Sequence, residues 1–473
     1  MISSDFLLSQ ATDAPGAAEH EHHLRRLRER LTDRMVGPTD HGWDAARRAW
    51  NLAADQHPAL VAFPETADEI VDIVAFAREH GLRVTPQGTG HGAGPLRSLA
   101  DTVLLKFARM NTVHIDPDRR RARVGAGATW GQVQHAAAAH GLAGLAGSSL
   151  NVGVAGYTLG GGLGWLGRRH GLACNSVLAV DVVTSDGRTL RVDGDDEPDL
   201  FWALRGGGGS FAVVTALEIE LYPAPELYAG VLYWPHEQAT EILQAWRTWT
   251  AGLPEAVTSV GRILALPDSR WIPTMLRNRS FVAVEAACLT GEAEGIELLR
   301  PMRDLGPTMD TFGMLPPTML DGLHMDPIEP IPAYFDGWLV GDLPAEAIDA
   351  LVAAAGSTSG SPLMSVELRH LGGALAEVGP DHGALASLEA GFAAVVLNVV
   401  DEETHLTAEE RTGAVRSSLA PWEAERTYPN FAARSLDASA FFEPETAERL
   451  RRVKGRYDPT DVICSPHPVP PRV

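Results

Sequence analysis

The 473-residue chain has few cysteines and no long hydrophobic run. Its three cysteines, Cys174, Cys288 and Cys464, are far apart, and no CxxC pair or Cys/His cluster accompanies them. This pattern predicts neither a disulfide framework nor a metal site, and it fits a reducing cytoplasm. No apolar stretch is long enough to span a bilayer, so the sequence predicts no membrane partner.

Basic residues are also in the minority. The chain has 39 Lys and Arg against 61 Asp and Glu, which gives a formal net charge of -22. Such a charge repels phosphate backbones and anionic lipids, so we expect no nucleic-acid partner. The length exceeds what one hydrophobic core usually covers and predicts two domains. We expect a monomer or a homodimer.

The N-terminal segment lacks the apolar core of a signal peptide. Its first sixteen residues, MISSDFLLSQATDAPG, are followed by the highly charged EHEHHLRRLRER. The HEHH stretch is a solvated helix start or, alternatively, a chelating cluster. We interpret residues 1–44 as a mobile or loosely docked leader of a cytoplasmic protein.

From residue 58 the pattern indicates a βαβ-type unit. A short apolar strand precedes an amphipathic helix, in which Thr66 and Glu69 have the spacing of a capping box and Gly81 provides the left-handed stop. A second strand then leads into a glycine-rich turn. Two hairpins, around residues 116–118 and 186–187, follow before Pro223. The sequence therefore predicts a first domain over residues 45–222.

After Pro223 the character of the chain changes. Helices alternate with strands that carry polar residues at every second position, which is typical of an antiparallel sheet covered on one face. This pattern predicts a second, α+β domain over residues 223–425, with a Met/Pro-rich loop at 308–334 that lines an apolar pocket. Residues 426–473 contain one amphipathic helix and no strand set, so we expect them to dock on the first domain.

Three glycine-rich stretches lie in the predicted first domain, at residues 86–94, 153–164 and 206–209. Glycine lets backbone N–H groups approach a phosphate closely. No GxGxxG motif opens a helix, and no acidic residue follows at ribose-binding distance, so this is not a Rossmann domain. The three stretches predict a long ligand with a pyrophosphate, either FAD or another dinucleotide. For the first stretch alone, a structural turn with a chance histidine is equally consistent.

These stretches resemble a known family. PQGTGHGAG, NVGVAGYTLGGGLGWLGRRHGL and DLFWALRGGGGSFAVVTALEIELYP resemble the FAD-binding domain of the vanillyl-alcohol oxidase/p-cresol methylhydroxylase superfamily, and within it the berberine bridge enzyme-like oxidoreductases. NFAARS and VKGRYDPTDVI resemble the closing C-terminal element of that family. The resemblance implies a two-domain α+β fold, in which an antiparallel-sheet substrate domain packs over the flavin of a PCMH-type FAD-binding domain.

The resemblance also implies a cofactor linkage and its contacts. His91 corresponds to the histidine that carries FAD through an 8α-histidyl bond. Many relatives hold the flavin through a second, cysteine bond, but Ser149 stands at that position, so a single covalent bond is expected. The further cofactor contacts that the resemblance implies are Gln87, Gly88, Thr89, Gly90, Gly92, Ser149, Val152, Gly153, Gly156, Gly160, Gly161, Gly162, Val214, Asn430 and Phe431.

The catalytic base is not evident from the resemblance. Many relatives use a tyrosine in an Asn-Tyr motif, and this chain has Phe431 at that point. Period-two alternation places Ser365, Glu367 and Arg369 on one face of a strand that would lie over the flavin. Glu367 is therefore a candidate base or, as an alternative, an ion-pair partner of Arg369. Other candidates for contact with the substrate are Asn398, Tyr428, His370, Arg262 and Glu285.

The predicted activity is oxidation of a small organic substrate. An alcohol, amine or natural-product intermediate would lose a hydride to flavin N5, and O2 would then reoxidise the flavin. Val152 occupies the position that borders the oxygen path in the family, and its modest side chain favours O2 as acceptor. Two alternatives remain: an FAD-dependent dehydrogenase or cyclase with another acceptor, and a catalytically inert flavin- or ligand-binding protein.

Overall fold

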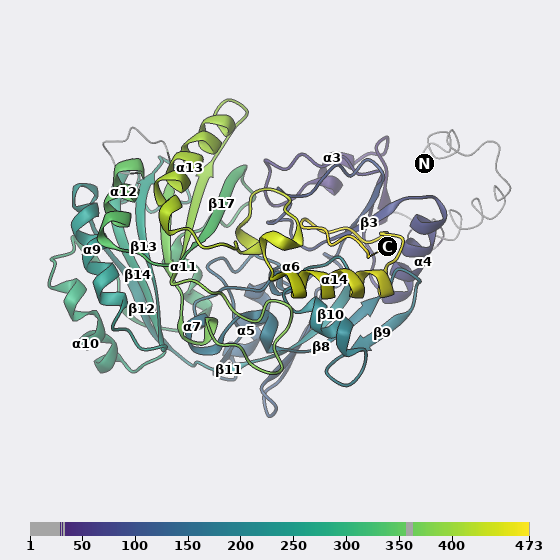
Figure 1. The fold of residues 1–473 in the computed structure, drawn as a ribbon, viewed down its shortest axis with the longest axis horizontal. Helices are drawn as coiled ribbons and strands as arrows, with labels where there is room; N and C mark the ends of the chain where they lie inside the picture. Colours follow the sequence, from purple (N-terminus) through teal and green to yellow (C-terminus); the bar gives the residue numbers. More distant parts are fainter. Residues whose placement is uncertain (1–28, 30, 32–33, 356–362, 473) are drawn as a thin grey trace.

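The computed structural model describes residues 29, 31, 34–355 and 363–472 (Figure 1). Most of the predicted leader, including the HEHH stretch, lies outside the described residues. At the end of that leader, β1 (Met35–Val36) pairs antiparallel with β2 (Leu60–Ala62). Helix α3 (Trp43–Arg47) lies between these two strands in the chain. The first sheet therefore begins about ten residues before the predicted boundary at residue 45.

The predicted βαβ-type unit is present in the first sheet. Strands β2 and β3 (Arg83–Gln87) both run parallel to β4 (Thr102–Lys106), and α4 (Ala67–Glu79) connects β2 to β3. The side chain of Thr66 caps α4 by accepting a hydrogen bond from the Glu69 N–H. The Glu69 carboxylate does not complete a capping box, because it binds Arg34 and the Glu65 N–H instead.

The second sheet is antiparallel, with strand order β5-β6-β10-β8-β9. The two predicted hairpins form its edges, and Gly187 adopts φ +84° at the second turn. A two-stranded sheet of β7 and β11 lies beside it. The strands of these two sheets are β5 (Val113–Asp116), β6 (Arg121–Gly125), β7 (Leu142–Ala143), β8 (Val177–Val183), β9 (Thr189–Val192), β10 (Val213–Glu220) and β11 (Tyr222–Pro223), and the helices of this region are α5 (Trp130–Ala138), α6 (Val154–Leu159), α7 (Gly167–His170) and α8 (Pro198–Leu204).

The third sheet is larger, and all its strand pairs are antiparallel. Its order is β15-β12-β14-β13-β18-β19-β17, with β16 also paired to β12. Helices α9, α10, α12 and α13 lie on one side of it (Figure 1), and their apolar residues, such as Trp246 of α9, pack on Val366 and Leu368 of the sheet. This arrangement confirms the predicted α+β fold. The bounds are β12 (Leu227–Pro235), β13 (Val257–Leu266), β14 (Arg279–Cys288), β15 (Met309–Asp310), β16 (Gly313–Leu315), β17 (Ala333–Val340), β18 (Ser365–His370), β19 (Phe392–Val399), α9 (Ala239–Thr250), α10 (Glu292–Arg303), α12 (Ala345–Ala355) and α13 (His405–Leu419).

The prediction of a Met/Pro-rich loop at 308–334 is wrong where this stretch forms short strands and a helix. This stretch contributes β15 and β16 to the edge of the third sheet and forms the short helix α11 (Asp321–His324). The edge of β12 would otherwise present unpaired N–H and C=O groups, and the two short strands pair with them. A Met/Pro-rich composition does not reveal this pairing, because strands of two and three residues leave no readable alternation.

The C-terminal segment lies against the first two sheets. Val84 of β3 donates its N–H to the Val462 carbonyl and accepts from the Cys464 N–H, so the tail extends the first sheet. Helix α14 (Pro444–Tyr457) buries Lys454, whose ammonium binds the Asp458 carboxylate and the carbonyls of Ser210 and Ile463. The Ser210 contact ties the last segment to the residue that follows the glycine loop at 206–209.

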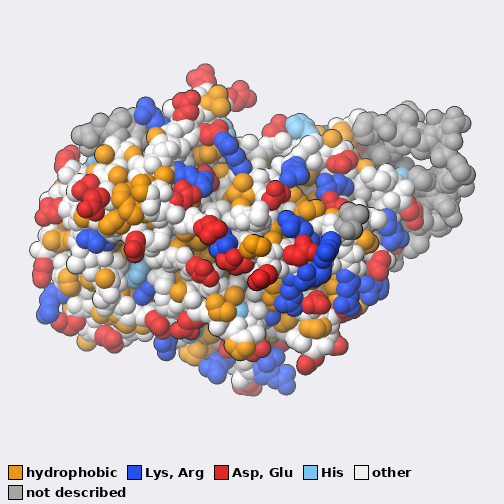
Figure 2. Space-filling model, in the orientation of Figure 1, with side chains coloured by type: hydrophobic (Ala, Val, Ile, Leu, Met, Phe, Trp, Pro, Cys, Tyr) orange, Lys and Arg blue, Asp and Glu red, His pale blue; other side chains and the backbone are white. Residues whose placement is uncertain are grey.

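One face of the molecule shows how the charges are distributed. In Figure 2, acidic and basic side chains are interspersed, and no face-wide basic surface is present in that view. Arginines of α14 form ion pairs: Arg449 binds Asp199 of α8, and Arg451 binds Glu448 within α14. Within the described ranges, no helix is long and apolar enough to cross a membrane.

Candidate active site

A cavity of about 700 Å³ is lined by all three parts of the chain. This volume is in the range of cofactor and substrate sites. The three glycine-rich stretches, the polar face of the third sheet and the C-terminal segment supply its wall. All the predicted cofactor contacts line it except Gly161 and Gly162, which lie behind the wall.

Bare backbone borders the cavity at several glycines. A Cβ atom added to Gly92, Gly156 or Gly208 would meet no other atom within 4 Å. Gly90 is required for another reason: it has φ +91°, and a Cβ there would come within 2.9 Å of the Ala49 Cβ. The uncovered backbone at Gly92, Gly156 and Gly208 lets N–H groups approach an anionic ligand closely. The cavity wall therefore fits a dinucleotide with a pyrophosphate.

His91 lies in this wall with both ring nitrogens bound. Its Nδ1 is 2.8 Å from the Thr89 hydroxyl oxygen, and its Nε2 is 3.0 Å from Oδ1 of Asn151. The ring stacks on Trp50, with 4.0 Å between ring centroids and 16° between planes. Burial lowers the pKa of His91 to about 4, although the Asn151 hydrogen bond opposes this shift. The imidazole is therefore neutral near pH 7, and one of its two nitrogens carries a lone pair in place of a hydrogen.

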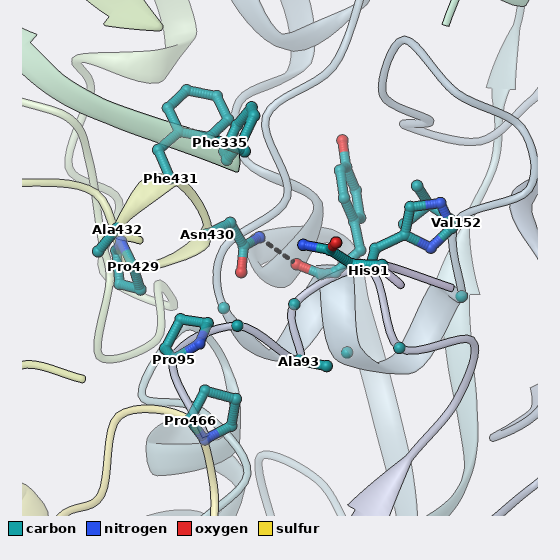
Figure 3. Close-up of a pocket in the computed structure, with 18 of the residues that line it drawn as sticks. His91, Ala93, Pro95, Val152, Phe335, Pro429, Asn430, Phe431, Ala432 and Pro466 are labelled. Carbon is teal, nitrogen blue, oxygen red and sulfur yellow. Dashed lines mark hydrogen bonds between the residues drawn. The ribbon is translucent and has the colours of Figure 1, made fainter. Parts of the chain in front are cut away.

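The surroundings of His91 include two positions that the family resemblance singled out. The Ser149 hydroxyl donates to Oδ1 of Asn151 at 2.6 Å, and Val152 borders the cavity next to His91 (Figure 3). Cys464 also lines the cavity, on the C-terminal segment. Burial raises the pKa of its thiol to about 11, so it is not a nucleophile near pH 7.

The polar face of the third sheet carries a buried cluster of charges. Arg262 donates to Glu285 at 2.6 Å, and His324 bridges Glu285 at 2.6 Å and Glu367 at 3.0 Å. Arg369 donates to the second oxygen of Glu367 at 2.9 Å. The predicted alternation along β18 is confirmed, because Val366 and Leu368 pack on the opposite, helix-covered side.

The pKa values in this cluster reflect its opposite charges. Burial alone would raise the pKa of Glu367, but His324, Arg262 and Arg369 outweigh it and hold this pKa well below its usual range. Burial and Arg262 act to lower the pKa of His324, but Glu285 and Glu367 outweigh them and raise it to about 9. Near pH 7 the cluster is therefore fully ionised.

Tyr428 and Asn430 connect the C-terminal segment to the second glycine-rich stretch. The fully buried Tyr428 hydroxyl accepts hydrogen bonds from the N–H groups of Gly162 and Leu163, at 2.8 and 3.0 Å. Burial raises the pKa of Tyr428 above its usual value, so the phenol stays protonated. The Asn430 amide donates to the Tyr157 carbonyl (Figure 3), and a Cβ on Gly160 would lie 1.9 Å from Asn430 Oδ1.

Four of the residues predicted for catalysis or substrate contact lie outside the cavity wall: Arg262, Glu285, His370 and Asn398. His370 is next to Arg168, 3.1 Å from its guanidinium, and burial lowers the pKa of His370 to about 3. Asn398 accepts from the Met364 N–H across the sheet. Glu367, Arg369 and Tyr428 do line the cavity. In the described part of the chain, no group of three or more His, Cys, Asp or Glu is arranged to hold a metal ion.

Sequence reasoning missed His324 and Asn151. His324 lies in the Met/Pro-rich stretch, where no periodicity indicates its direction. The available signal was the pair of carboxylates Glu285 and Glu367, on the two strands that flank β13, since buried acids need cationic partners. Asn151 stands between two predicted cofactor contacts, Ser149 and Val152, and its polar amide was the only signal.

Comparison with known proteins identifies the cofactor. The FAD binding domain family matches residues 58–193. (R)-6-hydroxynicotine oxidase of Paenarthrobacter nicotinovorans is 35% identical over 201 residues, so the match spans 42% of this chain and only 44% of that relative. The uncharacterized FAD-linked oxidoreductase YvdP of Bacillus subtilis is 27% identical over 93% of this chain and 98% of its own length.

Solved structures share the whole fold. The 6-hydroxy-D-nicotine oxidase of Arthrobacter nicotinovorans has a TM-score of 0.78 at 23% identity and covers 90% of this chain and 95% of its own. The berberine bridge enzyme-like protein 1 of Physcomitrella patens has a TM-score of 0.81 at 19% identity and covers 94% and 99%. The predicted two-domain flavoprotein fold and the dependence on FAD are confirmed.

Proposed function

We propose that this FAD-dependent oxidoreductase, with the fold of the berberine bridge enzyme-like proteins, carries FAD covalently on His91 and oxidises a small organic substrate with O2 as acceptor. The observation that supports this proposal best is His91 itself, a neutral imidazole stacked on Trp50 in the wall of a cavity bordered by bare glycine backbone. Bound FAD would supply the hydride acceptor, flavin N5, and the route of electrons to oxygen.

The chain's own residues suit a single 8α-histidyl bond. The turn at residues 86–94 and the stretch from Ser149 to Gly160 would hold the cofactor, and Ser149 replaces the cysteine of a second bond. In the linkage, a C–N bond replaces one C–H bond of the flavin 8-methyl group. That hydrogen and the imidazole hydrogen leave with two electrons, and dioxygen takes them up as hydrogen peroxide.

The substrate would lie between the flavin and the third sheet. Phe335 and Phe431 meet edge to face in this part of the wall (Figure 3), with 5.7 Å between ring centroids. The Arg369 guanidinium carbon lies 5.3 Å from the centroid of the Phe431 ring. Aromatic side chains with one cation suit a largely apolar molecule with a polar group at one end. An alcohol, an amine or a natural-product intermediate meets this requirement.

The proton acceptor that we propose is the Glu367–His324 pair. Glu367 lines the cavity as a carboxylate, and its Oε1 is 3.0 Å from His324 Nε2, so a proton received by Glu367 has an onward acceptor when His324 is neutral. His370 and Asn398 do not line the cavity and bind Arg168 and Met364 instead, and the Tyr428 phenol is occupied by backbone donors.

The proposal that O2 is the electron acceptor rests on Val152, whose short side chain leaves space next to the flavin-linking histidine. A cytoplasmic location and a monomeric or dimeric state stay predictions from the sequence. We propose two domains, at residues 45–222 and 223–425, with the tail returning to the first; β1 (Met35–Val36) extends the first sheet into the predicted leader.

The proposed function is tested on the purified wild-type protein. Denatured protein should fluoresce as flavin in a gel, with one flavin mapped to the peptide that contains His91. After anaerobic reduction by dithionite, admission of air should restore the oxidised spectrum within seconds and release peroxide. Flavin lost entirely on acid precipitation would contradict the covalent bond, and a reduced flavin stable in air for minutes would contradict O2 as acceptor.

A further inference from the structure

The side-chain amide of Asn151 lies at a junction of three chain segments. Its Oδ1 is 3.0 Å from His91 Nε2 and 2.6 Å from the Ser149 hydroxyl oxygen. Its Nδ2 is 2.7 Å from the Ile328 carbonyl and 3.4 Å from the Pro327 carbonyl. The amide thus joins the flavin-linking histidine to the segment that follows α11 in the substrate part of the chain.

These contacts define the orientation of the amide. An amide NH2 only donates, and a carbonyl oxygen only accepts, so Nδ2 must face the carbonyls of Pro327 and Ile328. A flipped amide would place its oxygen against both carbonyls and leave the Ser149 hydroxyl facing an NH2 group. Oδ1 therefore faces His91, and it can only accept a hydrogen there.

The same logic determines which nitrogen of His91 carries the hydrogen. Because Asn151 Oδ1 accepts, Nε2 of the neutral ring must be the N–H donor, and Nδ1 must hold the lone pair. The Thr89 contact agrees, since the Thr89 oxygen accepts from the Gly153 N–H at 3.3 Å and its own hydrogen is free to point at Nδ1. Trp50 restrains the plane of the ring by stacking.

We infer that Asn151 is a positioning residue for cofactor attachment, which holds His91 in the Nε2–H tautomer so that Nδ1 is the atom that bonds to the flavin. This inference rests on the proposed covalent function. The bond to C8α takes the place of the Thr89 contact at Nδ1. Positive charge that develops on the ring as Nδ1 reacts is stabilised at Nε2–H by Asn151 Oδ1.

Ser149 thereby acquires a role of its own. It stands where many relatives of this type carry the second flavin-linking cysteine, and here its hydroxyl donates to Oδ1 and helps to orient Asn151. The segment at 325–331 has a role as well, because its carbonyls hold the other end of the amide. Attachment of the cofactor should therefore depend on correct docking of the substrate part of the chain.

The test compares four proteins made in riboflavin-limited cells and then incubated with FAD: wild type, Asn151→Leu, Asn151→Asp and Asn175→Leu. Asn151→Leu removes the acceptor, and Asn151→Asp keeps an acceptor for Nε2–H. Asn175 is the matched control, since its amide is also half-buried between backbone groups but does not line the cavity. Total bound FAD, covalent flavin against time, and the linking nitrogen in the wild-type peptide (by NMR) are measured.

We expect Asn151→Leu to bind FAD but to form the covalent bond about 10²-fold more slowly, as a wrong histidine tautomer does elsewhere. Asn151→Asp should restore the rate, Asn175→Leu should match wild type, and the wild-type linkage should be at Nδ1. A linkage at Nε2, or unchanged attachment in Asn151→Leu, overturns the inference even if Asn151→Asp misfolds. Wild-type protein without covalent flavin would instead reject the proposed function.

Discussion

His324 and Glu367 form a buried pair on the cavity side of the third sheet, with 3.0 Å between His324 Nε2 and Glu367 Oε1. The other ring nitrogen of His324 binds Glu285 at 2.6 Å, so one imidazole joins two carboxylates. Each carboxylate also binds an arginine. The pKa of His324 is raised to about 9, whereas the pKa values of Glu285 and Glu367 are lowered, so His324 is the member of these three whose charge changes above pH 7.

The rate of substrate oxidation should therefore depend on pH through His324. Its pKa is raised to about 9, so the neutral form that accepts a proton from Glu367 appears as pH rises through 9. We expect the rate of flavin reduction at saturating substrate to increase with pH through that value. In Glu285→Gln the imidazolium loses a stabilising carboxylate, and the midpoint should move to lower pH. Anaerobic stopped-flow measurements from pH 7 to 10 check both; a flat profile in both proteins would exclude His324 from the proton path.

Removal of the carboxylate itself gives a second prediction. Glu367→Gln should keep the flavin spectrum and slow flavin reduction by roughly 10²–10⁴-fold, the usual contribution of a general base. Tyr428→Phe is the control, because its phenol accepts from two backbone N–H groups and its raised pKa keeps it protonated. If Tyr428→Phe alone stops reduction, the phenol is the base and Glu367 is structural.

The covalent bond should depend on His91 and not on a thiol. His91→Ala should still bind FAD through the glycine-rich wall but should lose flavin fluorescence in a denaturing gel. Cys464→Ser should keep that fluorescence, because Cys464 lines the cavity but its pKa of about 11 leaves it protonated. Peptide mapping by mass spectrometry reads the attachment site. Flavin found on a cysteine peptide would contradict the single bond.

Oxygen access should depend on the side chain at position 152. Val152→Leu adds one methylene group beside the linking histidine and should slow reoxidation in air several-fold, while reduction by substrate is nearly unchanged. Val214→Leu is a matched control, since Val214 also lines the cavity. Both half-reactions are followed by flavin absorbance. Equal slowing in the two variants would indicate a general loss of space and no local oxygen path.

Two glycines of the second glycine-rich stretch should respond differently to alanine. At Gly156, inside α6, a Cβ meets no atom, so Gly156→Ala should stabilise the FAD-free protein by about 0.5–1 kcal/mol yet weaken FAD binding by entering the cavity. At Gly160 a Cβ would lie 1.9 Å from Asn430 Oδ1, so Gly160→Ala should lower the stability of the FAD-free protein in addition to weakening FAD binding. Denaturant unfolding and FAD titration in a His91→Ala background separate the two effects.

Much of the fold was readable from the sequence because its signals are local. The Thr66 cap, the glycine stops and the turn at Gly187 depend on neighbours a few residues away. The placement of Ser365, Glu367 and Arg369 on one face follows from the alternation of Cβ directions along a strand. The segment at 308–334 was not readable, because its short strands are stabilised by the edge of β12 and not by their own pattern.

The candidate site divides in the same way. By itself, the sequence determined the glycine-rich stretches, His91 and the faces of the strands, since each is a property of a residue and its immediate neighbours. Only the tertiary structure decided that His324 joins Glu285 to Glu367, and that Asn151 bridges His91 and the carbonyls of Pro327 and Ile328. These partners are 39 to 177 residues apart, and they meet only because sheet register and domain packing bring them together.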